Sequence, residues 1–157
     1  MKRVLFVCNG NVCRSPMAEF VFRELARRRG LENAVGCESA GTTVFAPTSP
    51  VHNGPVRQLN REHIPYYQRG SRNITAADYD RFDYLLGMTR SHVQAMEQEF
   101  DGDPQSKLHR LLDFTHQPRD IDDPWYTGDF VTAYNDIAAG CNALLDSMFP
   151  NSAERKK

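Results

Sequence analysis

The sequence predicts an α/β fold, a four-stranded parallel sheet flanked by helices on both faces. Short apolar runs rich in β-branched residues alternate with segments whose apolar residues recur every three or four positions, which indicates strands alternating with helices. The apolar runs also lack the in-and-out alternation of a solvent-facing strand, as expected for strands buried in a parallel sheet. Ligands of such sheets bind beyond the carboxyl ends of the strands.

The first unit is a strand, a loop and a helix. Residues 4–7, Val-Leu-Phe-Val, are continuously apolar and predict a strand that is buried on both faces. Helical spacing begins at Ser15 and continues until Gly30. We expect Ser15 to cap this helix and Pro16 to occupy its first position. The residues between strand and helix therefore form a short loop at the carboxyl end of the strand.

The rest of the chain continues the alternation. Further strands are expected at residues 34–39, 82–88 and 108–112, and further helices at residues 56–63, 91–100 and 130–148. Thr75 is expected to cap a turn through Asp80. Residues 41–54 and 114–127 are polar and contain prolines, so we expect long irregular loops there. Loops of that length are often functional.

Length and charge limit the class of protein. The chain has 157 residues, of which 40% are hydrophobic and 25% charged, which predicts a single domain over residues 1–150 and a frayed tail over residues 151–157. A net charge of −1 argues against nucleic acid or an anionic membrane as a partner. The longest apolar run near the start is too short for a signal peptide or a membrane span, so we expect a cytoplasmic protein.

The cysteines and histidines predict thiols rather than disulfides or a metal centre. The four cysteines are Cys8, Cys13, Cys37 and Cys141. Without a secretion signal, thiols are the more common state of such cysteines. The five histidines show no HExxH spacing, and the chain has no Cys-x-x-Cys motif. We therefore expect no metal and no cofactor.

The loop after the first strand carries the candidate chemistry. It places the thiol of Cys8 and the guanidinium of Arg14 at its two ends, and it is just long enough to surround one tetrahedral anion. Gly10 and Asn11 tolerate positive φ, so the loop can turn its backbone N–H groups inward. The following helix adds the positive end of its dipole. The predicted phosphate-binding residues are Asn9, Gly10, Asn11, Val12, Cys13, Arg14 and Ser15.

Cys8 is the candidate nucleophile. The same positive field should stabilise its thiolate, so we expect Cys8 to be ionised at neutral pH and to attack phosphorus. Arg14 can bind two phosphoryl oxygens at once, and Ser15 can donate a hydrogen bond to the sulfur. A lone cysteine after a buried strand is more often a core residue. The combination of Cys, Gly, Asn and Arg-Ser-Pro between a strand and a helix favours the nucleophile.

A second group should protonate the departing oxygen of the substrate, and Asp123 is the candidate. It lies in the motif Ile-Asp-Asp-Pro-Trp-Tyr of the second long loop. Pro124 stiffens the backbone there, and the rings of Trp125 and Tyr126 are expected to line a substrate pocket. An isolated Asp-Pro pair usually marks a turn, so the catalytic interpretation depends on its pairing with the Cys8 loop.

These motifs resemble those of the low-molecular-weight protein tyrosine phosphatases. Residues 7–16, Val-Cys-Asn-Gly-Asn-Val-Cys-Arg-Ser-Pro, look like the phosphate loop of that family. Residues 39–42, Ser-Ala-Gly-Thr, look like its segment after the second strand, and residues 123–126, Asp-Pro-Trp-Tyr, like its general-acid loop. The resemblance covers nearly the whole chain in the same order. It implies the phosphotyrosine protein phosphatase I-like fold.

The resemblance implies metal-free hydrolysis of phosphotyrosine in proteins or peptides, and of small aryl phosphates, with inorganic phosphate as the product. Cys8 would form a phosphocysteine, and Arg14 would bind the phosphoryl group. Asp123 would donate a proton and then activate water. Asn11 and Ser15 would hold the loop and tune the thiolate.

The resemblance also concerns the residues around the loop. Phe45 and Trp125 match the aromatic positions that wall the substrate ring in the family. Cys13 matches the neighbour that forms a reversible disulfide with an oxidised nucleophile. Arg69-Gly70-Ser71-Arg72 stands where the family commonly has Gly-His before Ala-Arg, so the histidine that braces the loop asparagine is missing. Thr89 replaces a usual aspartate, and residues 43–57 form a longer stretch than is typical.

Three alternatives stay open at this point. A protein-arginine phosphatase resembles the same family but typically has threonine at the position of Val12, so Val12 favours phosphotyrosine. A thiol-dependent arsenate reductase shares the fold and the loop but needs two further cysteines in the region after the fourth strand. Residues 91–100 contain none. A non-catalytic phosphate-binding module would usually lack the nucleophile or the acid, whereas Cys8 and Asp123 are both present.

Overall fold

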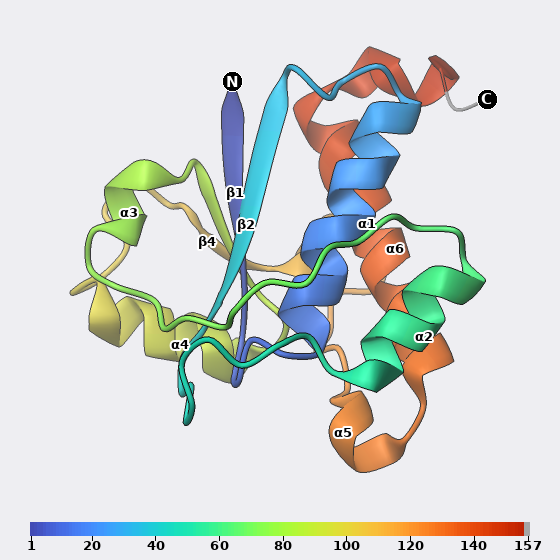
Figure 1. Cartoon of the computed structure of the whole chain (residues 1–157). Helices are drawn as coiled ribbons and strands as arrows, with labels where there is room; N and C mark the ends of the chain where they lie inside the picture. The colour runs from blue at the N-terminus through green and yellow to red at the C-terminus, as the bar shows by residue number, and fades with distance from the viewer. Residues whose placement is uncertain (156–157) are drawn as a thin grey trace.

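The computed structural model describes residues 1–155 and contains a four-stranded sheet with the order β2-β1-β3-β4 (Figure 1). The strands are β1 (Lys2–Cys8), β2 (Val35–Gly41), β3 (Tyr84–Gly87) and β4 (Leu108–Arg110). β1 is central, because it pairs with β2 on one side and with β3 on the other, and every pairing is parallel. The predicted fold class is therefore confirmed.

Helices cover both faces of the sheet (Figure 1). On one face α1 (Arg14–Arg28) packs against α6 (Phe130–Met148), with α2 (Asn53–Arg61) in contact with both. The other face is covered by α3 (Asp78–Arg81) and α4 (Arg90–Glu99). The remaining elements are α5 (Pro124–Thr127) and the 3-10 helices η1 (Leu111–Phe114) and η2 (Pro150–Arg155). Within residues 1–155, none of the helices is long and apolar enough to span a bilayer.

β1 lies between two hydrophobic clusters. Val4, Phe6 and Cys8 belong to the cluster beneath α1 and α6, whereas Leu5 and Val7 belong to the cluster beneath α4. The first four apolar residues of the strand are 0% exposed, which confirms the predicted burial on both faces. Burial of each such side chain stabilises the fold by about 1.5–3 kcal/mol. The period of the strand thus places Cys8 on the α1 side, at the carboxyl end of the central strand.

The strand order opens a crevice next to Cys8. The chain passes from β1 through α1 to β2 on one side, and it reaches β3 on the other side, so the loops after β1 and β3 diverge.

β2 ends at Gly41, whose absent side chain lets the Cys8 loop approach. A Cβ at Gly41 would lie 2.3 Å from the carbonyl oxygen of Asn9. The N–H of Thr42 donates to the Cys8 carbonyl at 2.9 Å.

Several boundaries differ from the prediction. α1 begins at Arg14, because the Ser15 hydroxyl contacts the Cys8 sulfur instead of capping the helix. α2 begins three residues earlier than expected, at Asn53, and ends at Arg61. A turn begins at Thr75 as expected, but it is held through the backbone: the Thr75 carbonyl accepts from the N–H of Asp78 at 3.0 Å, and the Thr75 N–H donates to the Asp78 carboxylate at 2.9 Å.

The loops and strand ends also contain more local structure than expected. β1 and β2 extend beyond their predicted ranges, and β3 and β4 are shorter, with Leu111 and Leu112 in η1 rather than in a strand. The second long loop is interrupted by α5, which the Asp123 carboxylate caps. The last expected helix, over residues 130–148, has the predicted bounds.

The chain after Met148 contacts Arg29, which follows the end of α1. η2 follows, and Ser152 is buried. The Ser152 hydroxyl accepts a hydrogen bond from Arg29 Nη1 at 3.1 Å, and the same nitrogen lies 2.7 Å from the Asp146 carboxylate. Arg29 is 1% exposed, so its charge is held among these partners. Residues 156–157 of the predicted tail lie outside the described residues.

Candidate active site

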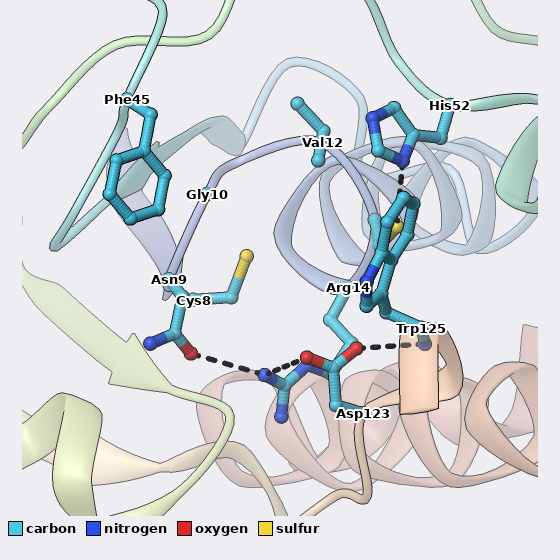
Figure 2. A pocket seen from close by; sticks show the side chains of 10 residues that line it. Cys8, Asn9, Gly10, Val12, Arg14, Phe45, His52, Asp123 and Trp125 are labelled. Atoms are coloured by element: carbon cyan, nitrogen blue, oxygen red, sulfur yellow. Dashed lines mark hydrogen bonds and ion pairs between the residues drawn. The ribbon is translucent and has the colours of Figure 1, made fainter. Parts of the chain in front are cut away.

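A cavity of about 280 Å³ opens at the carboxyl end of β1 (Figure 2). Most of the predicted site residues line it: Cys8, Asn9, Gly10, Val12, Cys13, Arg14, Phe45, Asp123 and Trp125. His52, which the sequence did not predict, lines it as well. Asn11 and Ser15 are buried beneath the loop. The fold thus brings together residues that are more than a hundred positions apart.

The Cys8 sulfur has a defined hydrogen-bond partner. Its Sγ lies 3.0 Å from the Ser15 Oγ. That oxygen accepts a hydrogen bond from Asn11 Nδ2 at 2.8 Å, which leaves the hydroxyl proton of Ser15 for the sulfur. Ser15 and Asn11 are both 0% exposed, so water does not compete for these bonds. The geometry suits a sulfur that carries negative charge.

The backbone of the loop offers unpaired donors. Within the part of the chain that the structure describes, no backbone N–H of residues 9–15 donates to a protein acceptor. Asn11 has a φ of 59°, in the left-handed region, whereas Gly10, for which the same was expected, does not. Buried N–H groups without partners are rare in proteins. Their concentration here, at the start of α1, is an arrangement that suits an anion.

Two arginines brace Asn11, where the resemblance to the phosphatase family implied a histidine that is missing. The N–H of Arg72 donates to Asn11 Oδ1 at 3.1 Å, and Arg69 Nη1 donates to the Asn11 carbonyl at 3.3 Å. The Arg69 guanidinium also contacts the Ser39 hydroxyl and lies 3.5 Å from the carboxylate of Glu19. Burial lowers the pKa of Arg69, and the negative charge of Glu19 opposes that shift. Together with the bond from Asn11 to Ser15, these contacts hold the left-handed conformation of Asn11 from three sides.

The Arg14 guanidinium is held at the floor of the cavity. Its Nη1 donates to the Ile121 carbonyl at 2.8 Å, and its Nη2 donates to Asn9 Oδ1 at 3.3 Å. The Ile121 carbonyl is itself fixed, because the N–H of Ile121 donates to the carbonyl of Met88 at 3.0 Å. Arg14 is 4% exposed. Figure 2 shows its guanidinium between Asn9 and Asp123.

His92 is a buried partner of this arrangement that the sequence did not predict. Its Nδ1 accepts a hydrogen bond from the N–H of Thr89 at 3.1 Å, so the proton of the neutral ring lies on Nε2. Nε2 donates to Asn9 Oδ1 at 2.5 Å, and the same oxygen faces Arg14. Burial lowers the pKa of His92 to about 4, and the charge of Arg14 adds to that shift. His92 is therefore neutral at physiological pH.

Asp123 lies at the rim of the cavity. Its Oδ1 accepts a hydrogen bond from the N–H of Trp125 at 3.0 Å, which caps α5, and its Oδ2 lies 3.3 Å from Arg14 Nη2. The ring of Trp125 packs on His52 with centroids 4.9 Å apart, and Phe45 stands on the opposite side of the cavity (Figure 2). Tyr126 is 85% exposed and is not among the lining residues.

The exposure of Tyr126 has a simple geometric reason. Successive residues of a helix point about 100° apart, so a helix that turns Trp125 toward the cavity turns Tyr126 away from it. We expected both rings to line the substrate pocket because residues 114–127 were predicted to be an irregular loop, without the helical turn of α5. Of the two rings, only that of Trp125 lines the cavity.

Cys13 is the second thiol of the cavity. Its Sγ lies 3.6 Å from His52 Nδ1. Burial raises the pKa of Cys13 to about 12, and the nearby Cys8 and Asp123 raise it further than Arg14 lowers it. Both cysteines of the loop are free thiols. Cys37 and Cys141 lie outside the cavity, against backbone carbonyls of α1.

Different signals would have been needed to find the missed residues. His92 follows the strand that neighbours β1, so a correct strand order would have placed it at the same sheet edge as Cys8. His52 and Arg69 lie in irregular chain with no periodicity, and nothing in the local sequence marks them. Among residues 1–155, no three His, Cys, Asp or Glu side chains gather as metal ligands.

A parallel sheet that presents a cysteine, an arginine and an aspartate around a cavity at the carboxyl ends of its strands fits the class of cysteine-dependent phosphatases. Comparison with known proteins agrees. The family model described as low molecular weight phosphotyrosine protein phosphatase matches residues 3–155. The low molecular weight protein-tyrosine-phosphatase YfkJ of Bacillus subtilis is 38% identical over 150 residues, which cover 94% of this chain and 96% of that protein. The chain belongs to this family of cysteine-dependent hydrolases.

Solved structures agree with the assignment. The crystal structure of YfkJ from Bacillus subtilis has a TM-score of 0.92 at 37% identity and covers 96% of each chain. A low molecular weight protein tyrosine phosphatase from Streptococcus pyogenes has a TM-score of 0.88 at 31% identity and covers 100% of both chains. YwlE of Bacillus subtilis, described as an arginine phosphatase, has a TM-score of 0.81 at 27% identity, covering 93% of this chain and 95% of that one.

Proposed function

We propose that this protein hydrolyses phosphotyrosine in proteins, and small aryl phosphates, through a phosphocysteine intermediate on Cys8. The observation that carries the proposal is the set of unpaired N–H groups of residues 9–15 around the Cys8 sulfur, with the Arg14 guanidinium beside them. Such donors favour a tetrahedral oxyanion and stabilise the charge that develops on a phosphoryl group during transfer. A thiolate is the nucleophile that the same donors favour.

The first step transfers the phosphoryl group to sulfur. Cys8 attacks phosphorus, an S–P bond forms, and the bond to the leaving oxygen breaks. The loop N–H groups and the Arg14 guanidinium bind the three equatorial oxygens. Ser15 donates to the sulfur at 3.0 Å, which stabilises the thiolate before the attack and again when sulfur departs. His92 and Asn9 hold Arg14 in place throughout.

Asp123 moves the protons of both steps. In the first step its carboxylic acid protonates the leaving oxygen, and in the second step its carboxylate takes a proton from the water that attacks phosphorus. Inorganic phosphate leaves and the Cys8 thiolate is restored. In the free site the 3.3 Å contact with Arg14 holds Asp123 at the rim. A phosphoryl group that engages Arg14 frees Asp123 to face the leaving oxygen.

The walls of the cavity support an aromatic substrate. Phe45 and Trp125 stand on opposite sides of the opening, and Val12 adds an apolar surface between them (Figure 2). An aryl ring can stack on such side chains. We also propose the cytoplasm as the compartment of action, because the nucleophile must stay a free thiol.

The experiment that tests the proposal compares the wild type with Cys8→Ser on para-nitrophenyl phosphate in the presence of EDTA. The wild type should turn over without metal. Cys8→Ser should show no measurable turnover but still bind inorganic phosphate, because the loop donors remain and a serine hydroxyl is not ionised at neutral pH. Turnover by the wild type that EDTA abolishes, or near wild-type activity of Cys8→Ser, would contradict the proposal.

A protein-arginine phosphatase is the second candidate, and the structural likeness to YwlE favours it. The apolar Val12 in the cavity lining favours phosphotyrosine instead. Phosphotyrosine and phosphoarginine peptides of the same flanking sequence, assayed side by side, separate the two. A higher kcat/KM for phosphoarginine would make the second candidate correct.

A further inference from the structure

The catalytic cavity continues into a groove along α2. A second hollow, of about 440 Å³, shares His52 and Trp125 with the catalytic cavity. A third, of about 190 Å³, shares Gly54, Arg57 and Phe130 with the second. Because neighbouring hollows share lining residues, the three adjoin one another, from Cys8 past Trp125 to the exposed side of α2. We call the second and third hollows the α2 groove.

We propose that the α2 groove binds the polypeptide segment next to the phosphorylated residue and prefers acidic side chains there. The inference rests on the proposed function, because the groove begins where the substrate ring would sit. It goes further by assigning a class of substrate, a phosphoprotein with carboxylates near the phosphorylated position. Such a preference lies outside the chemistry of the Cys8 loop.

Two unpaired cations line the groove. Arg57 and Arg61 are one helical turn apart on α2, and both are exposed. With the residues that the structure describes, neither forms an ion pair; Arg61 donates only to the Gln58 side-chain oxygen, at 3.2 Å. Most other arginines of residues 1–155 pair with a carboxylate. Arg57 and Arg61 therefore keep their donors for an incoming anion.

The carboxylates that line the cavity and the groove are already engaged. Asp129, in the third hollow, accepts hydrogen bonds from the N–H and the hydroxyl of Thr132, at 2.9 and 2.6 Å. Asp123, at the border of the catalytic cavity, faces Arg14. An acidic peptide would meet the two unpaired guanidinium groups against the single carboxylate of Asp129, whose oxygens already accept from Thr132. Guanidinium binds carboxylate in a bidentate geometry.

The groove also has an apolar surface against which a peptide can pack. Trp125 is 62% exposed at its border with the catalytic cavity. Phe130 lies against Gly54, where a Cβ would approach the Phe130 ring to 2.3 Å. Glycine at this position therefore lets the ring pack onto the start of α2. Exposed aromatic rings beside arginines are typical of surfaces that bind a peptide.

The test measures kcat/KM for two phosphotyrosine peptides, with para-nitrophenyl phosphate as the reference substrate. One peptide carries glutamates on both sides of the phosphotyrosine, and the other carries glutamines at the same positions. The wild type should prefer the acidic peptide by about fivefold at low salt, and the preference should shrink toward equality at high salt because exposed charges are screened. The preference should appear mainly in KM.

Two variants connect that preference to the groove. Arg57→Glu should bring the two peptides to equal or reversed kcat/KM, relative to the reference substrate. Lys2→Glu changes the charge by the same amount at the opposite end of β1 and should keep the preference of the wild type. Arg57→Gln, which removes one charge without reversing it, should lower the preference by about half. Circular dichroism checks that each variant is folded.

The outcomes separate the groove from the chemistry. Equal kcat/KM for the two peptides in the wild type, or a preference that persists in Arg57→Glu, would contradict the proposed binding of acidic segments in the α2 groove. Either result would leave the proposed function intact. A wild type that hydrolyses none of the three substrates would overturn the proposed function. In that case, equilibrium binding of the two peptides still decides the groove, because equal affinities would contradict it and a salt-dependent preference lost in Arg57→Glu would support it.

Discussion

Two regions meet at the cavity, and they are held very differently. The loop of residues 8–15 is mostly buried, and its supporting side chains form hydrogen bonds with residues from several elements. α5 is a single helical turn whose two rings are exposed, and Asp123 at its start is held by its own cap and by Arg14. Under the proposed function, the difference means that the phosphoryl group would meet preorganised donors, whereas the rest of the substrate would meet an open rim.

The largest expected effect comes from the buried region. Arg14→Lys should lower kcat/KM for para-nitrophenyl phosphate by about 10³-fold, because lysine cannot bind two phosphoryl oxygens while also donating to the Ile121 carbonyl. Steady-state kinetics measure the loss. Arg27→Lys, the same change at an exposed position of α1, is the control and should be near wild type. A loss below tenfold in Arg14→Lys would mean that the guanidinium is not what binds the phosphoryl group.

A smaller and selective effect is expected at the rim. Asp123→Asn should lower kcat by about 10²-fold for alkyl-like leaving groups, whose oxygen needs a proton, and much less for activated phenols. A series of aryl phosphates with different leaving-group pKa values measures this dependence. Asp122→Asn, at the exposed neighbour, is the matched control. Equal losses across the series would remove Asp123 from the acid role.

His92 provides a pH-dependent test of the buried region. Its pKa of about 4 in the folded protein lies below the 6.5 of a free histidine, so the unfolded chain binds the proton first as pH falls. Folding stability should therefore be lost between pH 6.5 and 4, by about 1.4 kcal/mol per pH unit at most.

The matching variant is His92→Gln, whose amide can still donate to Asn9 Oδ1. Urea unfolding at pH 7 and at pH 4.5 should show that the wild type is more stable than His92→Gln at pH 7 and that this advantage shrinks at pH 4.5. An advantage that stays constant between the two pH values would mean that His92 is not buried in its neutral form. If His92→Gln keeps its fold at pH 7 but has a lower kcat than the wild type, His92 also positions Arg14, through Asn9.

The smallest effect concerns the two rings of α5. Trp125→Ala should lower kcat/KM for aryl phosphates by about fivefold, because the lost stacking surface is worth about 0.5–1.5 kcal/mol. Tyr126→Ala should stay within about twofold of the wild type, because this ring lies outside the cavity lining. The two variants each truncate one of two adjacent aromatic side chains to alanine. Equal losses would show that both rings reach the substrate, as the sequence alone suggested.

The sequence predicted the site where its signal is local. Cys8 and Arg14 lie in one short stretch, and the spacing between a strand end and a helix start already implies a loop around an anion. Asp123 was predicted because Asp-Pro-Trp-Tyr is a distinctive local motif. The alternation of apolar strands and periodic helices likewise predicted the fold class, since each element carries its own pattern.

The supporting residues could not be predicted, because their contacts are made across the chain. His92 lies 83 positions from Asn9, and Arg72 lies 61 positions from Asn11. Such pairs depend on strand order and on loop paths that no periodicity encodes. Ser15 shows a second reason, since its hydroxyl could cap a helix or face the sulfur, and tertiary structure decides between the two.

The central claim is that Cys8 becomes covalently phosphorylated, and rapid-quench mass spectrometry tests it most directly. The Asp123→Ala substitution should slow the hydrolysis of the intermediate. When this variant is mixed with excess para-nitrophenyl phosphate, the peptide that contains Cys8 should therefore gain one phosphoryl group within the first turnover. The same peptide from the Cys8→Ser variant should gain none on that timescale. If the wild type turns over fully and neither the wild type nor Asp123→Ala yields a phosphorylated Cys8 peptide, the claim of a phosphocysteine intermediate is contradicted.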